Sequence, residues 1–454
     1  MNKREFLAAG GAVPLMLAGC GGSGTGSAPV RLVNASVGYP KLGFMVESTE
    51  ATSTDVAYGF ASPFETVQAG AVGITLTVAN QAATSAQIRT LSKDSRYSLI
   101  AYGFANELKQ VLITESTVTP DAGKANVNVL NTSVDIGPVD VYLSSDKALT
   151  VSTLIASSIT GVQQSAFAPT LAGDYYITVV GANSVAKGIS DVRFQTATKI
   201  TLTALEVLTI ILTPGASGVL ANAILLTQGT AIPANGATDP LANLTARVRA
   251  VTAVPGMQAS VTGTNSAGSV TILGSSTAPQ YSNYFVVNTG TPPVVMVNGS
   301  AVPVLMDVKA ADGTVTTGQP GALAAGGDYT LMVYLNGSTP TAKLIQDNNT
   351  APVTSQGVKF RLINLASDNQ GLALSMSVNS LSIASNIGYG MASEYAEQPT
   401  PQAANSTVEV FNGTDAILSH VQIMTLPNIF TDIVVSVPPG GGPAKDFFRA
   451  ASGT

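Results

Sequence analysis

Apolar residues alternate with small or polar residues in short runs along most of this chain. The runs at residues 139–143, 257–261 and 372–378 show this period of two, and no stretch longer than a turn has a convincing helical period. Such alternation is typical of strands that bury one face. Because turns rich in Gly and Pro separate the runs, the pattern predicts an all-β protein built from short antiparallel strands.

A longer pattern repeats four times. Each copy opens with an apolar strand that ends near small residues, and these strands begin at Val30, Val127, Ala246 and Phe360, which are 97, 119 and 114 residues apart. A second strand, an aromatic residue before a turn, and a later apolar strand follow in the same order. Several short strands in units of about 100 residues indicate tandem Ig-like antiparallel β-sandwiches.

Turn-rich segments separate the copies and set the predicted domain boundaries. Stacked end to end, four sandwiches would make an extended rod. The predicted divisions are a signal peptide at 1–19, a flexible tether at 20–28, and sandwiches at 29–123, 124–240, 241–357 and 358–454.

The N-terminus has the features of a lipoprotein leader. Lys3 and Arg4 precede a short apolar stretch, and Leu17-Ala-Gly-Cys20 resembles the bacterial lipobox, in which the thiol is acylated and the leader is cut just before it. Cys20 is the only cysteine and is the predicted lipidation site. Gly21, in place of Asp, indicates sorting to the outer membrane. The Lys3-Arg4 pair also resembles a degenerate twin-arginine signal, so the export route stays open.

Residues 200–226 are apolar enough to resemble a membrane span. Glu206 interrupts this run, and Pro214-Gly-Ala-Ser-Gly218 divides it into two halves of strand length. We therefore expect a hairpin inside the second sandwich rather than a transmembrane helix.

These landmarks resemble tandem copies of a bacterial family, domain of unknown function 4397. The third copy departs most from the pattern, because Ala250 and Val251 stand where Asn and Ser are expected. The resemblance implies Ig-like sandwiches on secreted or surface proteins and implies no catalytic residues. The segments that match best are Val30-Arg-Leu-Val-Asn-Ala-Ser36, Val139-Asp-Val-Tyr-Leu143, Phe167 with Ala172-Gly173, and Tyr329-Thr-Leu-Met-Val-Tyr334.

Composition narrows the classes of function. Charged residues make up 11% of the chain, and the net charge is −6 with no basic cluster outside the leader, which argues against nucleic acid. His420 is the single histidine, so a zinc site lacks the ligands it needs and a Ser-His-Asp triad would have to use His420. We expect His420 instead to be an edge-strand or surface residue. We expect no enzyme and no cofactor.

Two segments carry candidate oxygen ligands for calcium. Asp347-Asn-Asn349 and Ser367-Asp-Asn369 lie near expected domain junctions, where calcium binding and Asx turns explain the residues equally well. The chain has no Trp, and most Tyr and Phe occupy repeated strand positions, which favours core packing over a sugar-binding platform.

Two hypotheses for function follow. The first is a cell-envelope lipoprotein, attached to the membrane through Cys20, that acts as a structural, adhesive or protein-interaction module at the bacterial outer membrane or cell surface. The second is a solute- or glycan-binding lipoprotein with a pocket between domains. Both expect a protein or glycan partner at the surface, and neither fixes the oligomeric state.

Overall fold

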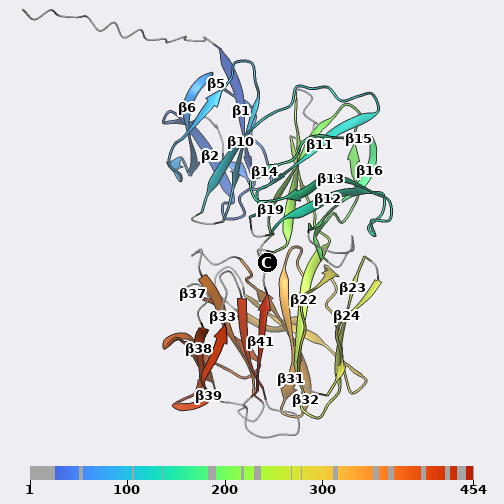
Figure 1. The fold of residues 1–454 in the computed structure, drawn as a ribbon, viewed down its shortest axis with the longest axis vertical. Coiled ribbons are helices and arrows are strands. Elements are labelled where there is room, and N and C mark those ends of the chain that lie inside the picture. The colour runs from blue at the N-terminus through green and yellow to red at the C-terminus, as the bar shows by residue number, and fades with distance from the viewer. Residues whose placement is uncertain are drawn as a thin grey trace, which may run out of the picture.

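A computed structural model gives the structure of this protein, and Figure 1 shows its fold. The described residues contain strands and turns and no α-helix, which confirms the all-β prediction. The structure describes residues 26–452 except for 51–54, 105–106, 135, 183–190, 216–218, 230–236, 267, 278, 310–314, 351–356, 367–372, 400–404, 425–429 and 437–445.

The strands form eight sheets, which pack in pairs as four successive sandwiches. We call the sheet that contains the first strand of a sandwich its inner sheet and the other its outer sheet. The first inner sheet contains Ser27–Asn34 (β1), Glu65–Gln68 (β5), Tyr97–Tyr102 (β9) and Lys109–Thr114 (β10). Its outer sheet contains Lys41–Val46 (β2), Thr49–Glu50 (β3), Val56–Ala57 (β4), Gly70–Val78 (β6), Gln81–Ala82 (β7) and Gln87–Leu91 (β8).

The second sandwich is also built from an inner and an outer sheet. Its inner sheet contains Lys124–Asn131 (β11), Gln163–Gln164 (β14), Ala168–Leu171 (β15), Val207–Pro214 (β19), Ala221–Thr227 (β20) and Thr238–Leu241 (β21). Its outer sheet contains Val139–Ser144 (β12), Ser152–Ile159 (β13), Gly173–Gly181 (β16), Val192–Gln195 (β17) and Ile200–Leu202 (β18).

The third sandwich has the largest inner sheet, which a hairpin extends at one edge. The inner strands are Thr245–Ala253 (β22), Gln280–Tyr281 (β25), Phe285–Asn288 (β26), Val304–Lys309 (β29), Val315–Pro320 (β30), Asp328–Asn336 (β31) and Thr339–Asp347 (β32). The outer strands are Ala259–Asn265 (β23), Gly268–Ser276 (β24), Val294–Val297 (β27) and Ser300–Val302 (β28).

The fourth sandwich closes the chain. Its inner strands are Gly357–Leu365 (β33), Met391–Ala392 (β36), Ala396–Pro399 (β37), Phe430–Ser436 (β40) and Asp446–Ser452 (β41). Its outer strands are Leu374–Val378 (β34), Leu381–Ile387 (β35), Asn405–Asn412 (β38) and Asp415–Met424 (β39).

Each inner sheet contains a parallel pair at its centre. The first strand pairs with a later strand that runs in the same direction: β1 with β9, β11 with β19, β22 with β31, and β33 with β40. The later strand then turns back into an antiparallel neighbour, which is β10, β20, β32 or β41. The two central strands therefore end at the same edge of each inner sheet.

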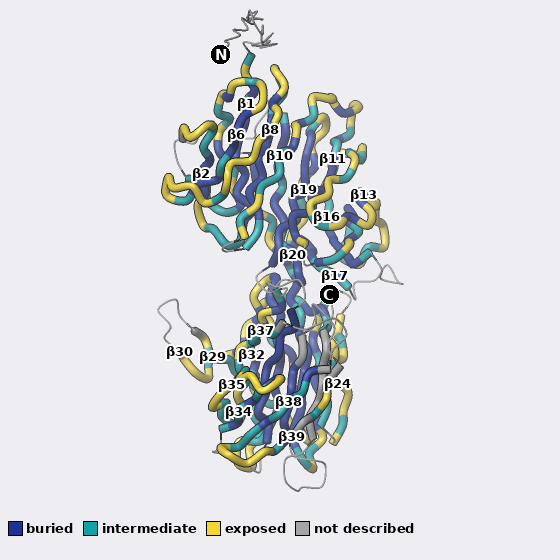
Figure 2. Tube along the Cα trace, turned by 60° about the vertical axis from the view of Figure 1, so that its left-hand side comes forward, coloured by how far each residue is buried: buried dark blue, intermediate teal, exposed yellow. Residues whose placement is uncertain are grey.

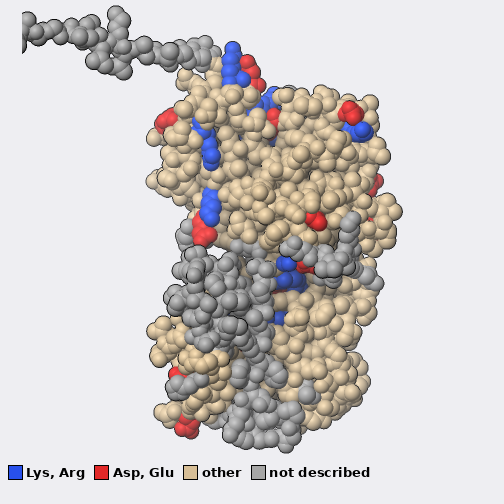
Figure 3. Space-filling view, in the orientation of Figure 1, with Lys and Arg blue, Asp and Glu red and all other residues tan. Residues whose placement is uncertain are grey.

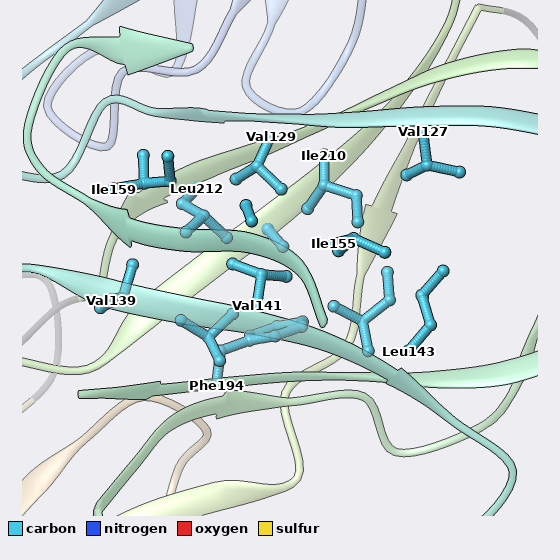
Figure 4. Packing of buried hydrophobic residues seen from close by; sticks show 14 of the residues in the cluster. Val127, Val129, Val139, Val141, Leu143, Ile155, Ile159, Phe194, Ile210 and Leu212 are labelled. Atoms are coloured by element: carbon cyan, nitrogen blue, oxygen red, sulfur yellow. The ribbon is translucent and has the colours of Figure 1, made fainter. Parts of the chain in front are cut away.

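The core of each sandwich lies between its inner and outer sheets. In the second sandwich, Val127 and Val129 from β11 face Val139 and Val141 from β12, with Phe194 beside them (Figure 4). Alternate residues along a strand point to opposite faces, so the period of two in the sequence identifies these core residues.

The inner sheets of neighbouring sandwiches pack face to face. Val33 and Ile100 of the first sandwich meet Leu130 and Ile211 of the second. The third and fourth sandwiches join in the same way through Val251, Ala253, Met332, Tyr334, Ile363, Leu365 and Val434. We call these two contacts the upper and lower seams, and the sandwiches they join the upper and lower pairs.

The paired arrangement overturns the expectation of an end-to-end rod. The four sandwiches stand as two pairs, side by side within each pair, and the strands at each seam are buried (Figures 1 and 2). A seam covers the second face of each inner sheet, because that face carries its own apolar residues.

The apolar run at residues 200–226 forms strands β18, β19 and β20, as the hairpin prediction requires. Every residue of β19 is buried, because its two faces lie against the core of the second sandwich and against the upper seam. A strand covered on both faces reads as a continuous apolar run. No helix among the described residues is long and apolar enough to cross a membrane.

The chain passes from the upper to the lower pair at residues 242–244, and β17 holds this segment. The Asn243 side-chain carbonyl accepts from the amides of Gln195 (3.3 Å) and Thr245 (3.0 Å), while its amide group donates to the Ala221 carbonyl (3.0 Å). The Leu244 amide donates to the Gln195 carbonyl (2.7 Å). These bonds restrain the junction between the pairs.

The third copy has a different register from the one its sequence suggests. In the parallel pairs, Arg31 lies opposite Ser98 and Arg249 lies opposite Thr330, so Arg249 and not Arg247 is the equivalent of Arg31. The equivalent of Asn34 is then Thr252. A shift of two residues keeps every side chain on the same face, so the alternation alone could not detect it.

Candidate functional sites at the two seams

A serine before each repeated aromatic residue fixes the local backbone in all four sandwiches. Each serine lies two residues before its aromatic, in Ser-Xaa-Phe or Ser-Xaa-Tyr. Its hydroxyl accepts from an amide of the first strand and donates to the carbonyl of the next residue. The serine–amide pairs are Ser62–Leu32, Ser165–Val129, Ser282–Ala250 and Ser393–Leu362.

This turn places the aromatic ring against an arginine of the first strand in three sandwiches. The guanidinium carbon lies 4.7 Å from the ring centroid for Arg31 on Phe64. The same distance is 4.5 Å for Arg249 on Tyr284 and for Arg361 on Tyr395. Buried cation–π contacts of this kind are more stabilising than exposed ones, because water does not compete for the cation.

Polar residues occupy equivalent positions at the seam in all four sandwiches. On the parallel pairs these positions hold Arg31 with Ser98, Asn128 with Thr209, Arg249 with Thr330, and Arg361 with Asp432. A third equivalent position lies two residues after the residue that pairs with Ser98, Thr209 or Thr330 on the next strand. It holds Glu115, Gln228 and Asp347 in the first three sandwiches.

In the upper seam these positions form one ion pair. Arg31 lies 2.5 Å from Glu115, and both side chains are fully or almost fully buried. Ser98 accepts from the Nε of Arg31 (2.9 Å) and donates to Glu115 (2.6 Å). The pair also reaches the second sandwich, since Arg31 donates to the Thr227 carbonyl (2.8 Å) and Glu115 accepts from the Gly229 amide (3.1 Å).

The second sandwich contributes neutral groups to the same seam. The Thr209 hydroxyl donates to Asn128 (2.7 Å) and accepts from Gln228 (2.6 Å). Gln228 in turn accepts from the amide of Ser116 (2.8 Å). Amides here replace the guanidinium and carboxylate of the first sandwich.

In the lower seam the equivalent positions hold two cations and two anions. Arg361 donates to Asp347 of the third sandwich (2.6 Å) and to Asp432 of its own (3.0 Å). Arg249 forms an ion pair with Asp432 across the seam and donates to the Thr330 hydroxyl (2.8 Å). The arginines and aspartates are almost completely buried, so each sandwich supplies the partners that the other needs.

Three tyrosine hydroxyls also bind the two aspartates of the lower seam. We call the two arginines, the two aspartates and these three tyrosines the lower cluster. Tyr281 and Tyr395 donate to Asp432 at 2.7 Å and 2.8 Å, and Tyr284 donates to Asp347 at 2.5 Å. These bonds satisfy carboxylate oxygens that burial removes from water, which a buried charge requires.

The lower cluster shifts the ionisation of its members. Burial disfavours the ionised form of Asp432, but Arg249 and Arg361 outweigh it and hold the Asp432 pKa at about 2. Burial raises the pKa of Tyr281, Tyr284 and Tyr395. In the upper seam, burial lowers the pKa of Arg31, although Glu115 opposes this shift. Asp432 is thus ionised, and the three tyrosines are protonated, near neutral pH.

The structure gives mixed outcomes for the residues that the sequence singled out. Cys20 and segment 367–372, with its Ser-Asp-Asn, lie outside the described residues, as does the side chain of His420 in β39. Asp347 is engaged by Arg361, Thr330 and Tyr284, and Asn349 donates to Asp328 (2.7 Å), so these residues already have partners. Within the described ranges, no three His, Cys, Asp or Glu side chains gather as a metal site.

A cleft opens beside each polar cluster. The upper cleft has a volume of about 620 Å³ and is lined by Glu115 and Gln228 together with Arg96 and Glu206. The lower cleft has a volume of about 480 Å³ and is lined in part by Asp347 and Arg361. Both lie where two sandwiches meet, and the upper one is the larger.

Sequence reasoning missed the seam clusters. Arg31 stands between apolar neighbours on a half-buried strand, a pattern that normally places the charge in water. One available signal was the recurrence of Ser two residues before each aromatic. The other was a first strand with apolar residues on both faces, such as Leu32-Val33, which indicates a second covering layer.

Comparison with known families fits this geometry. The model of one family matches residues 28–142, which cover the first sandwich and continue through β11 into β12. The family is described as Domain of unknown function (DUF4397), and residues 28–142 match its model. The match covers the first of the four repeated units, and the other three share its strand order. No curated protein matches the chain.

Two solved structures are weakly similar to this chain. One, provisionally named a cell adhesion protein, is from Bacteroides uniformis; it is 7% identical, has a TM-score of 0.18, and covers 50% of this chain and 99% of its own. The other is the fimbrial anchor protein Mfa2 from Porphyromonas gingivalis, 12% identical with a TM-score of 0.19, covering 50% of this chain and 98% of its own. Likenesses this distant carry no argument about function.

Proposed function

We propose that this protein is a non-catalytic structural or adhesive module of the bacterial cell envelope, attached to the outer membrane or cell surface by lipid on Cys20. One observation carries the proposal: the sandwiches are locked in pairs by buried seams, and hydrogen bonds restrain the junction between pairs. Such a body holds its outer faces in fixed relative positions, which suits the display of a contact surface.

The outer surface supports contact with a partner. Figure 3 shows a face with few charges, and large apolar side chains such as Ile88 (71% exposed) and Leu171 (65% exposed) lie in water. Few charges at sheet edges and faces leave little to oppose association with another protein. The partner is a protein or glycan at the cell surface.

The anchoring part is tested by fractionation. We expect wild-type protein to take up a palmitate analogue and to stay with the outer membrane, and Cys20→Ser protein to appear in the soluble fraction without label. Wild-type protein that takes up no label would contradict lipid anchoring.

The adhesive part is tested with cells that carry each variant at equal abundance. We expect attachment or envelope assembly to fall in cells that lack the protein and in cells with Cys20→Ser. Cells with His420→Ala should match wild type, because the proposal gives that imidazole no role. A hydrolytic or transfer activity that disappears with His420→Ala would overturn the non-catalytic assignment.

A second candidate function is the binding of a small solute or glycan between domains. The clefts beside the two seams favour it, because each is lined by two sandwiches. A saturable small ligand that protects the intact protein from unfolding would support this alternative.

A further inference from the structure

The upper cleft has walls of different character. The first sandwich contributes Arg96 and Glu115, and the connecting segment at residues 116–120 crosses between the sandwiches. The second sandwich contributes the turn at residues 203–207 and the end of β20. A volume of about 620 Å³ lies within the usual range for small-ligand sites, roughly 300–1,000 Å³.

The positive wall of the cleft is Arg96. Its guanidinium lies 5.4 Å from the centroid of Phe64, on the ring that Arg31 also contacts, and no carboxylate pairs with it among the described residues. Glu115, the nearby carboxylate of the cleft, is bound by Arg31, Ser98 and the Gly229 amide. A ligand carboxylate would therefore meet a cation whose charge is not already paired.

The opposite wall is negative and apolar. Glu206 uses one carboxylate oxygen to accept from the Thr203 amide (3.0 Å) and has no cation as an ion-pair partner within the described ranges. Leu205 and Val118 expose 54% and 67% of their surface at the cleft. Leu205 has a positive φ of 69°, which a bulky residue rarely adopts, and its amide donates to the Lys124 carbonyl (2.7 Å).

The charges select the chemistry of a ligand. With Arg31 and Glu115 paired, one cation (Arg96) and one anion (Glu206) face the cleft, so the site as a whole is neutral. A polyanion would gain from Arg96 but would be repelled by Glu206. A zwitterion with an apolar body complements both walls.

We propose that the upper cleft binds a short peptide with free termini: Arg96 binds its carboxylate, Glu206 its ammonium group, and Val118 and Leu205 contact its apolar side chains. No aromatic ring lines the described part of the cleft, and sugars normally stack on such rings, so a peptide fits better than a saccharide. This binding site is independent of the adhesive role.

Calorimetry on the full-length protein tests the proposal with the tripeptide Ala-Val-Leu. We expect saturable one-to-one binding at millimolar peptide. The carboxamide and N-acetyl forms should bind more weakly, roughly tenfold or more for the carboxamide, because each lacks one charged hydrogen-bond partner. Absence of saturable binding, or equal affinity for all three forms, would overturn the proposal. Galacturonate that binds as tightly as the tripeptide would overturn the assignment to a peptide.

Variants locate the site. Arg96→Gln should weaken Ala-Val-Leu roughly tenfold or more and abolish the preference for the free carboxylate over the carboxamide. Lys93→Gln removes the same charge from an exposed position three residues away, outside the cleft lining, and should leave affinity unchanged. Circular dichroism melts report whether each variant is folded. Equal affinity in folded Arg96→Gln and wild-type protein would contradict the role of Arg96.

Discussion

The upper and lower seams join the same faces of the same fold with different polar chemistry. In the upper seam, the equivalent positions hold one ion pair, Arg31 with Glu115, and neutral amides and hydroxyls from the second sandwich. In the lower seam, Arg249 and Arg361 are shared between Asp347 and Asp432. The apolar parts of the two seams are alike, being built from Val, Ile, Leu and Ala side chains with Met and Tyr added below.

This difference shows which part of a seam is fixed by the fold. Apolar side chains from both strands of each parallel pair are buried where two sandwiches meet, and this burial stabilises both seams. The polar positions vary, but each buried charge has an oppositely charged partner. For Arg31 and Glu115 this partner lies in the same sandwich, and each of the four charges of the lower seam has one partner in its own sandwich and one in the facing sandwich. The two seams therefore satisfy different polar residues on the same fold, and we expect the lower seam, with four charges, to depend most on keeping all of them.

The largest effect is expected for Asp432→Ala in the lower seam. The change leaves Arg249 and Arg361 buried with one carboxylate, Asp347, between them. An uncompensated buried charge costs about 3–5 kcal/mol. We expect hydrogen exchange of peptides from β33 and β40 to accelerate accordingly, while β1 and β9 keep their protection.

Asp432→Asn is the matched control for this prediction. It keeps the shape and an acceptor oxygen for one of Tyr281 and Tyr395, which donate to different oxygens of Asp432, but removes the charge. Its loss should therefore be smaller than that of the alanine variant. Protection of β33 and β40 that stays within about 1 kcal/mol of wild type in Asp432→Ala would show that the ions contribute little to the lower seam.

The next largest effect is expected in the apolar part of the upper seam. Ile211 lies on β19, fully buried against the first sandwich. Ile211→Ala should cost about 3 kcal/mol through lost burial and the cavity left behind. Because the seam is shared, we expect peptides from β1 and β9 of the first sandwich to lose protection together with β19. Ile88→Ala, on an exposed side chain, is the control and should change little. Loss of protection confined to β19 would contradict a shared seam.

Much of the fold could be predicted from the sequence because it follows from local periodicity. Alternation identified core residues such as Val139 and Val141, and Pro214 marked the turn between β19 and β20. The family resemblance at Val30-Arg-Leu-Val is borne out by the match at residues 28–142.

The pairing of sandwiches could not be predicted in the same way, because it depends on contacts between residues roughly 100 positions apart. Arg31 and Arg361 look like solvent-facing residues until a second sheet covers them. Whether a strand position faces water or another sandwich is decided by tertiary packing, and alternation reports only which residues share a face. The two-residue shift of the third copy was hidden for the same reason.

Lowering the pH should destabilise the lower pair by less than the two substitutions above. The pKa of Asp432 is about 2 in the folded protein, against 3.8 for an unperturbed Asp. A lowered folded-state pKa gives stability that is present above about pH 4 and is lost as pH falls toward 2, here about 2 kcal/mol. We expect the lower pair to lose hydrogen-exchange protection in this window, and Asp432→Asn to flatten the dependence. A pH profile that is identical in wild type and Asp432→Asn would contradict the shift.

The smallest net effect is expected when the upper ion pair is replaced as a unit. Arg31→Met alone leaves Glu115 buried without its cation and should cost about 3 kcal/mol of stability at the upper seam. The double variant Arg31→Met, Glu115→Leu removes both charges and keeps a similar volume, so it should lie within about 1 kcal/mol of wild type.

The ion pairs of the lower seam are connected to one another, whereas the upper seam has a single pair. Each of Asp347 and Asp432 contacts both Arg249 and Arg361, so removing any single cation–anion pair there still disturbs the contacts of the two charges that remain. In the upper seam, Arg31 and Glu115 form a single ion pair. Their other partners, Ser98, the Thr227 carbonyl and the Gly229 amide, are neutral, so removing both charges leaves no charged group of this cluster without its partner. Hydrogen exchange of β1 and β9 in both single variants and the double variant gives the coupling energy directly. Additive losses would mean that Arg31 and Glu115 act separately and not as one pair.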